Sequence, residues 1–195
     1  MNTGPFSIGT VILGGAAVAL AGVLLVGVVL PTSWEAEATT RVEANPETVF
    51  AYLDSPEGWR QWTTWPDSGV VRSGPSRGRG ATLAWDDQEL GQGSFTIVEA
   101  EGLRLVRYEV EVSGGAMHTQ GSFELSGEGT GTQVSWHESG DLGRNPLMGY
   151  WAFFMERAQT RELEKSLGRL ATLAAGGLAP EYEAPADTLS TGAVR

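Results

Sequence analysis

The chain has 195 residues, a formal net charge of −11 and no cysteine. This length predicts one globular domain with additional segments. The acidic balance argues against nucleic acid as a partner, because a phosphate-binding surface needs a basic stripe. The lack of cysteine excludes disulfides, thiolate metal sites and cysteine nucleophiles. Twelve arginines against a single lysine, with abundant glycine and alanine, are typical of a GC-rich bacterial genome.

After a short tail, residues 1–7, the segment 8–30 carries no charge over 23 residues. As a helix it would extend over about 34 Å, enough to cross a bilayer. A cleaved signal peptide is the alternative, but the run is long for one and no basic residue precedes it. We therefore expect a single-pass anchor in the cell membrane. Few basic residues flank the segment, so the positive-inside rule gives little information on its orientation. We expect the globular domain to be extracytoplasmic.

The next segments predict one strand and two short helices. Residues 34–44 alternate between apolar and polar, as in a half-buried strand. Asn45 and Ser55 are each followed by a proline, which favours a helix start at each position. The second helix is expected to end at Pro66.

Between this helix and residue 145, apolar and polar residues alternate in five runs separated by glycine-rich turns. One polar face and one apolar face are typical of an antiparallel sheet with a solvated side. The runs are ATLAWDD, GSFTIVEAEG, VRYEVEV, MHTQGSFEL and TQVSWHE.

Asn145 and Pro146 repeat the helix-start pattern, and a long helix is expected from Pro146 to about Ala175. Residues 176–195 are rich in proline, alanine and small polar residues and lack periodicity, so we expect a disordered tail. The long helix is the element expected to cover the apolar face of the sheet.

This order of elements resembles the helix-grip fold of the START-like, birch-pollen-allergen-like (SRPBCC) superfamily. The stretch TTRVEANPETVFAYLDSPEGWRQWTTWP resembles the opening of its polyketide cyclase/dehydrase and lipid-transport branch, and GTQVSW, NPLMG and LEKSLGRL resemble its closing pattern. The resemblance covers residues 33–175. It implies an α+β fold with a curved antiparallel sheet of six to seven strands around a long C-terminal helix, and a cavity for a hydrophobic small molecule. It brings no catalytic motif.

Few residues suit chemistry. Both histidines, His118 and His137, fall on the polar face of the sheet by parity, and no carboxylate accompanies them at metal-ligand spacing. We therefore assign no catalytic residue, no metal site and no cofactor.

A binding cavity is the remaining expectation, since ligand cavities are mostly apolar. Its expected lining is aromatic and aliphatic: Trp62, Trp85, Phe95, Ile97, Tyr108, Met117, Phe123, Trp136, Trp151 and Phe154. Trp59, Trp62 and Trp65 are interpreted as an aromatic plug, belonging to the core first and to the cavity wall only where a ring reaches the void.

Residues 146–155 carry no charge, which suggests contact with lipid or burial on several sides. Candidate membrane contacts are Trp34, Trp151 and Phe153.

The leading hypothesis is a membrane-tethered, non-enzymatic domain that binds or transfers a lipid, quinone or polyketide-like molecule. The alternative is a cyclase/dehydrase-type enzyme, for which Asp87 and Tyr108 are the candidate acid or base. A structural domain with a filled cavity is a third possibility, and the oligomeric state stays open.

Overall fold

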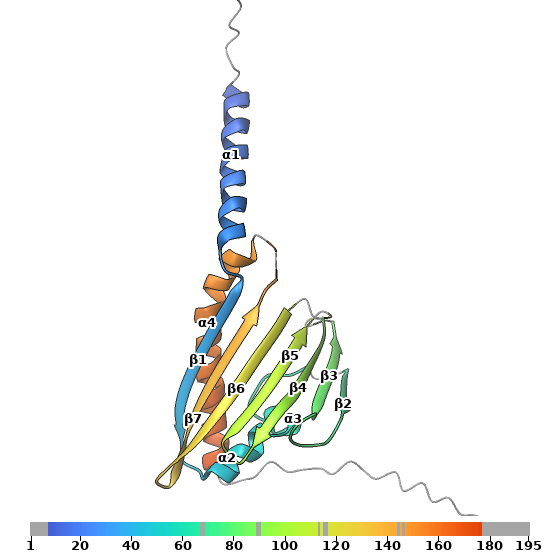
Figure 1. Cartoon of the computed structure of the whole chain (residues 1–195), viewed down its shortest axis with the longest axis vertical. Helices are drawn as coiled ribbons and strands as arrows, with labels where there is room; N and C mark the ends of the chain where they lie inside the picture. The colour runs from blue at the N-terminus through green and yellow to red at the C-terminus, as the bar shows by residue number, and fades with distance from the viewer. Residues whose placement is uncertain are drawn as a thin grey trace, which may run out of the picture.

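A computed structural model describes residues 8–66, 69–88, 91–112, 114, 117–143, 145 and 147–176. An N-terminal helix, α1 (Ile8–Val29), projects from an α+β domain (Figure 1). The domain consists of β1 (Ser33–Val42), α2 (Pro46–Leu53), α3 (Pro56–Trp59), β2 (Val70–Ser73), β3 (Thr82–Asp87), β4 (Gly91–Glu101), β5 (Leu105–Val112), β6 (Met117–Glu128), β7 (Gly131–Asp141) and α4 (Met148–Ala175). The expected tail falls almost wholly outside the described residues.

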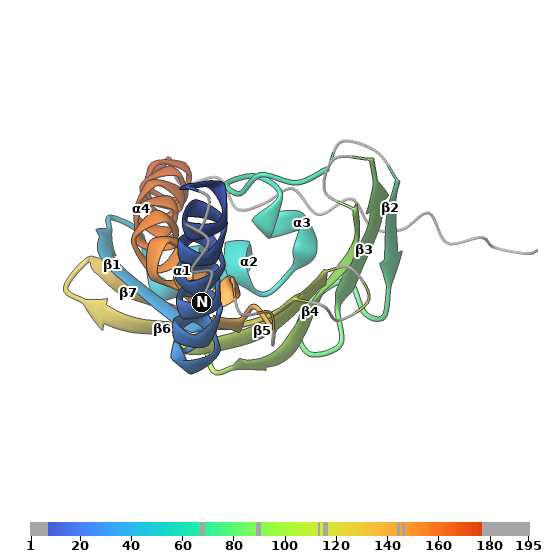
Figure 2. The same ribbon diagram turned by 90° about the horizontal axis from the view of Figure 1, so that it is seen from above.

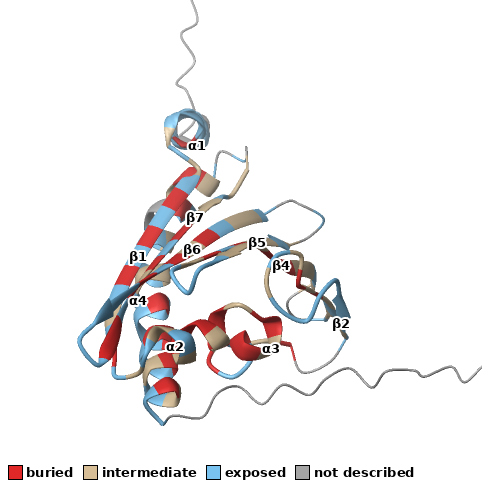
Figure 3. Ribbon diagram, turned by 60° about the horizontal axis from the view of Figure 1, so that its bottom comes forward, coloured by how far each residue is buried: buried red, intermediate tan, exposed pale blue. Residues whose placement is uncertain are grey.

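The seven strands form one antiparallel sheet in the order β1-β7-β6-β5-β4-β3-β2. This confirms the expected helix-grip arrangement. The alternation predicted for the first strand is present in β1, where buried and exposed residues alternate (Figure 3). The strand β2 has no counterpart among the predicted runs, because its four residues are too few to show a period.

Helices α2, α3 and α4 lie on the concave side of the curved sheet (Figure 2). The expectation that the long helix alone covers the sheet is wrong. Helix α4 packs chiefly on β1, while α2 contacts β6 and β7. The ring of Trp59, at the end of α3, reaches Phe95, Phe123 and Trp136 in the middle of the sheet. The three helices therefore share the apolar face, and a single helix is too narrow for seven strands.

The predicted helix starts are present at α2 and α3. The side chain of Asn45 accepts from the Thr48 N–H at 2.8 Å, and the Ser55 hydroxyl accepts from the Gly58 N–H at 3.1 Å. Helix α3 ends at Trp59 and continues as turns, so it is shorter than expected. Helix α4 begins at Met148, later than predicted, because Asn145 uses its side chain to accept from the Leu147 N–H before the helix starts.

The loop between β2 and β3 is held against α2 by Arg77. Its guanidinium donates from both Nε and Nη2 to the partly buried carboxylate of Asp54, with an Nη2–Oδ1 distance of 2.7 Å, and the Gly78 N–H donates to the Asp54 main-chain carbonyl at 2.6 Å. Paired donors to one carboxylate fix the loop geometrically as well as electrostatically. These contacts therefore fix Asp54, between α2 and α3, just before the turn that carries Trp59.

Helix α1 is apolar over its whole length, and its window Ile12–Val29 has a mean hydropathy of 2.6 with 6% of it buried. By length and composition it suits either a membrane span or a signal sequence. Its C-terminal end contacts the start of α4. The Tyr150 hydroxyl donates to the Val23 carbonyl at 2.9 Å. A Cβ on Gly149 would lie 2.5 Å from the Cβ of Leu30, so this approach requires a glycine.

Candidate functional site

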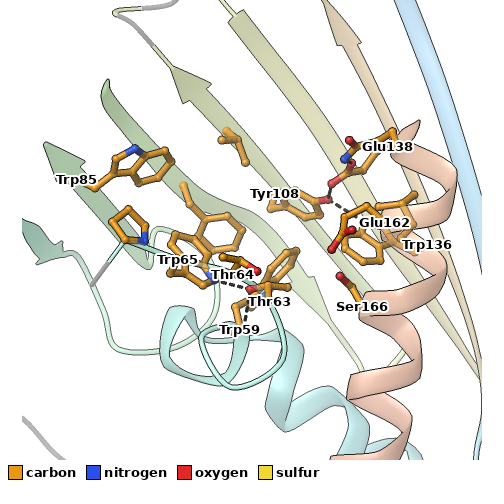
Figure 4. A pocket seen from close by; sticks show the side chains of 15 residues that line it. Trp59, Thr63, Thr64, Trp65, Trp85, Tyr108, Trp136, Glu138, Glu162 and Ser166 are labelled. Carbon is orange, nitrogen blue, oxygen red and sulfur yellow. Dashed lines mark hydrogen bonds between the residues drawn. The ribbon is translucent and has the colours of Figure 1, made fainter. Parts of the chain in front are cut away.

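A cavity of about 270 Å³ lies between the concave face of the sheet, the turn after α3 and the middle of α4 (Figure 4). Its wall is mostly apolar, and six of the fifteen described residues that line it are aromatic. The described residues that line it are Trp59, Thr63, Thr64, Trp65, Pro66, Trp85, Phe95, Tyr108, Val110, Trp136, Glu138, Gln159, Glu162, Leu163 and Ser166.

Trp59 is the centre of the aromatic wall. Its ring centroid lies 4.6 Å from those of Phe95 and Tyr108, in tilted and edge-on geometry, which aromatic pairs prefer to face-to-face stacking. Its indole N–H donates to the Leu53 carbonyl at 2.7 Å. The ring is thus fixed by packing and by a hydrogen bond, so this wall is preformed.

The three tryptophans of the predicted plug separate into two roles. Trp62 is 1% exposed, packs edge-on against Phe123 and Trp136, and does not line the cavity. Trp59 and Trp65 do line it, and Trp65 lies edge-on to Trp85, with ring centroids 5.8 Å apart. Trp62 is core, whereas its two neighbours are core and cavity wall together.

One end of the cavity is polar and almost sealed from water. The Tyr108 hydroxyl donates to one carboxylate oxygen of Glu138, and Gln159 Nε2 donates to the other at 2.6 Å. The Trp136 indole N–H donates to the Tyr108 hydroxyl at 2.8 Å. Glu138 is only 6% exposed. Four side chains from β5, β7 and α4 therefore form one continuous network.

The sheet register explains how Tyr108 reaches Glu138. Tyr108 pairs with Gly121 on β6, and Gly121 pairs with Glu138 on β7, so the three residues form one row across three strands. A Cβ on Gly121 would lie 2.2 Å from Cζ of the Tyr108 ring. The missing side chain lets the ring lie across the middle strand, which brings the hydroxyl to the carboxylate.

Burial controls the ionisation of this pair. It raises the pKa of Glu138 above its usual range, against the hydrogen bonds from Tyr108 and Gln159, which favour the charged form. It also holds the pKa of Tyr108 well above its usual range, and the Glu138 charge adds to this. Tyr108 consequently stays a hydrogen-bond donor, and Glu138 is the group in the wall suited to hold a proton or to accept hydrogen bonds.

The cavity brings together four of the residues predicted to line it: Trp85, Phe95, Tyr108 and Trp136. Trp62, Ile97 and Phe123 are buried but lie outside its wall.

Three further residues do not face the cavity, and for them the expectation is wrong. Met117 is 43% exposed at the start of β6. Trp151 and Phe154 are 57% and 66% exposed, because the first turns of α4 run beside the end of α1 instead of over the sheet.

Among the predicted membrane contacts, Trp151 is exposed, while the side chain of Phe153 lies outside the described residues. Trp34 is buried, which corrects the expectation for it. A Cβ on Gly140, its partner on β7, would lie 2.6 Å from Nε1 of Trp34, so the indole covers this glycine on the inner face of the sheet.

Sequence reasoning missed Glu138, Gln159, Glu162 and Ser166. The alternation in TQVSWHE predicts Val134 and Trp136 on the inner face of the sheet, and the same period extended by two residues puts Glu138 there as well. Gln159 and Ser166 lie four residues before and three after the buried Leu163, so helical spacing places them on the same side. Asp87, the other candidate acid, is not in the cavity wall.

Within the described residues, no group of three or more His, Asp and Glu side chains is arranged to hold a metal ion. His137 is exposed on the outer face of the sheet, and His118, on the same face, lies 3.9 Å from Glu109.

Comparison with known proteins agrees with this architecture. A search of curated proteins finds no match. Among solved structures, TTHA0849 from Thermus thermophilus superposes with a TM-score of 0.56 at 18% identity, covering 73% of this chain and 98% of its own. CalU16 from Micromonospora echinospora gives 0.51 at 18% identity, with 75% and 77% covered. DynU16, from the dynemicin biosynthetic locus, gives 0.52 at 16% identity, and the match spans 76% of this chain but only 49% of DynU16.

At these identities the solved structures establish the fold alone. The family model described as "Polyketide cyclase / dehydrase and lipid transport" matches residues 33–175, the whole domain from β1 to the end of α4. The chain therefore belongs to the polyketide cyclase/dehydrase and lipid-transport family.

Proposed function

We propose that this protein is a membrane-tethered domain that binds, and passes to or from the bilayer, a small hydrophobic molecule such as a lipid, quinone or polyketide-like compound. The observation that carries the proposal is the aromatic cavity between sheet and α4, which the core side chains leave unfilled. Its volume of about 270 Å³ is near the lower limit of ligand pockets. This size favours a compact, ring-bearing molecule over a whole diacyl lipid.

The tether is α1. Val23 accepts the hydrogen bond from Tyr150 and lies six residues before the end of α1, which corresponds to about 9 Å along a helix. If α1 crosses the membrane, the first turns of α4 lie at the level of the bilayer surface. Trp151 and Phe154 are exposed there, and tryptophan is a residue that is enriched at membrane–water interfaces. Phe153 stays a predicted contact.

This arrangement holds the cavity near the membrane. Gln159, at the polar end of the cavity, follows Trp151 by eight residues on α4, which is about 12 Å along the helix axis. A molecule leaving the bilayer at Trp151 would travel a short distance along α4 to reach the aromatic wall.

The cavity is tested with N-phenyl-1-naphthylamine, a neutral aromatic probe, added to the full chain in nanodiscs. All seven tryptophans lie between residues 34 and 151, so energy transfer from tryptophan to the probe reports binding in the domain. Val110→Phe adds a ring to the cavity wall and should weaken binding about tenfold or more. Val71→Phe is the matched control, because Val71 is 65% exposed and outside the wall. Equal energy transfer in all three proteins would refute the cavity as the binding site.

The membrane contact is tested with the full chain in vesicles that contain brominated lipid, which quenches tryptophan on contact. Trp151→Phe should remove most of the quenching, whereas Trp85→Phe, in the cavity wall, should leave it in place. Quenching that is insensitive to Trp151→Phe would contradict contact between the start of α4 and lipid.

An enzyme of the cyclase/dehydrase type is the second candidate, favoured by the position of Glu138 and Tyr108 in the cavity wall. A buried carboxyl group with a raised pKa beside a hydroxyl donor suits proton transfer to or from a bound chain. The readout is mass spectrometry of a bound polyketide-like compound after incubation. Cyclisation or loss of water that Glu138→Gln abolishes would support the enzyme, and an unchanged compound would support binding alone.

A further inference from the structure

The polar end of the cavity contains the carboxylate of Glu138, which forms no ion pair with a Lys or Arg among the residues that the structure describes. Both hydrogen bonds accepted by Glu138 come from neutral groups, Tyr108 and Gln159. The basic side chain that acts on its pKa is His137, the adjacent residue on β7, whose side chain is on the opposite face of the sheet. Buried carboxylates are ordinarily paired with a cation. Glu138 is therefore a group whose negative charge a positively charged ligand can neutralise.

The rest of the wall reinforces the same preference. Of the described residues that line the cavity, none is Lys, Arg or His, and a second carboxylate, Glu162, lies at the α4 side. Glu162 is half exposed and is paired with Arg169 and Lys165, so its charge is partly satisfied. Six of the other described lining residues carry aromatic rings, whose faces attract cations.

The carboxylate is also held in a fixed orientation toward the cavity. The two donors occupy one oxygen each, and an ionised carboxylate has about four acceptor positions, so acceptor positions remain on both oxygens. Since neutral donors are already supplied by the protein, a further neutral hydroxyl adds little. A positively charged donor adds a charge-assisted hydrogen bond and neutralises the buried charge.

We propose that the cavity selects compact aromatic or hydrophobic molecules that carry a protonated amine, with the amine against Glu138 and the apolar body between Trp59, Trp65 and Trp85. This inference rests on the proposed binding function and names its ligand class. Trp136 and Tyr108 belong to the end that would hold the amine, since the Trp136 indole N–H donates to the Tyr108 hydroxyl, which in turn donates to Glu138. Figure 4 shows the two ends, with Trp85 and Trp65 on one side and Glu138 and Trp136 on the other.

Three probes of nearly equal size separate charge from shape: 1-naphthylmethylamine, 1-naphthylmethanol and 1-naphthoic acid. Each is titrated against the full chain in nanodiscs of uncharged lipid, loaded with N-phenyl-1-naphthylamine, and displacement is followed by loss of energy transfer. The amine should displace at about tenfold lower concentration than the alcohol, because hydrogen bonds to charged groups exceed neutral ones by about 1–1.5 kcal/mol. The acid should be the weakest of the three.

The ratio of interest is the alcohol concentration that displaces half of the N-phenyl-1-naphthylamine divided by the amine concentration that does so. In Glu138→Gln this ratio should fall from about ten to about one. Glu162→Gln should change this ratio by less than about threefold, because Glu162 is exposed and already paired. A melting curve of each variant establishes that it is folded, and the series in the unaltered protein decides the question even if Glu138→Gln does not fold.

The outcomes distinguish the two claims. If the alcohol displaces as well as the amine from the unaltered protein, selection of amines is overturned while hydrophobic binding stands. A preference for the amine that persists in folded Glu138→Gln overturns the role of Glu138. If none of the probes displaces and Val110→Phe has no effect on the loaded probe, the proposed binding function itself fails.

Discussion

Replacing Gly121 by alanine should disrupt the polar end of the cavity without replacing any of the side chains that form its hydrogen-bond network. The added Cβ would lie 2.2 Å from Cζ and 2.3 Å from the hydroxyl oxygen of Tyr108. To restore an ordinary contact of 3.4 Å, the ring has to move by at least 1.2 Å. Tyr108 is 1% exposed and hydrogen-bonded to both Glu138 and Trp136, so this movement breaks buried hydrogen bonds.

The cost has two parts. Overpacking a filled interior costs about 1–3 kcal/mol, and leaving a buried hydrogen-bonding group unsatisfied costs about 1–3 kcal/mol. We therefore expect Gly121→Ala to lower the free energy of unfolding by about 2–6 kcal/mol. Urea titration of the detergent-solubilised full chain, followed by tryptophan fluorescence, measures this quantity for the domain, because α1 contains no tryptophan.

Gly127→Ala is the matched control on the same strand. Its new Cβ would meet only Pro46, at 3.6 Å, so the change should be within about 0.5 kcal/mol. In a Tyr108→Leu background, Gly121→Ala should lose most of its effect, since the clashing ring is absent. Two results would contradict the claim that Gly121 makes room for the Tyr108 ring. One is a loss of unfolding free energy in Gly121→Ala as small as that in Gly127→Ala, and the other is an equal loss with and without the Tyr108 ring.

Three further predictions concern charge, capping and the aromatic wall. Burial raises the folded-state pKa of Glu138 above the ordinary 4.5, so its contribution to stability is fully present below pH 4.5 and is lost as the pH rises through the folded pKa. The unfolding free energy of the unaltered protein minus that of Glu138→Gln should therefore decrease from acidic to neutral pH, and a flat difference would contradict the raised pKa. Asn45→Ala should lower the unfolding free energy by about 1 kcal/mol through loss of the α2 cap, whereas Asn45→Asp should have little effect; equal losses would argue against capping. Trp59→Ala should cost about 3–5 kcal/mol, the usual range for removing a buried aromatic ring, and a loss below about 1 kcal/mol in the same titration would show that this ring does not hold the wall together.

The sequence indicates the fold well because the relevant signals are local. The alternation in residues 34–44 and 106–112 and the caps at Asn45 and Ser55 each depend on neighbours in the chain, and the structure contains each of them. The start of α4 was predicted too early because an asparagine before a proline suits a turn as well as a helix cap.

The site is harder to predict because it depends on register and curvature. Strand parity identifies Tyr108 and Trp136 as inward-facing but not that Gly121 stands between Tyr108 and Glu138. Periodicity along α4 likewise does not predict that its first turns lie next to α1. Trp151 and Phe154 are therefore exposed, although the sequence predicted that they face the sheet. Both facts arise from the pairing of segments far apart in the chain.

The central claim, that this domain holds a hydrophobic molecule in its aromatic cavity, is tested most directly by native mass spectrometry of the full chain released from membranes. The unaltered protein and Val71→Phe should each carry a small hydrophobic molecule at about one per chain, and Val110→Phe should carry little or none. Protein of unmodified mass in all three, or the same bound molecule retained by Val110→Phe, would contradict the account.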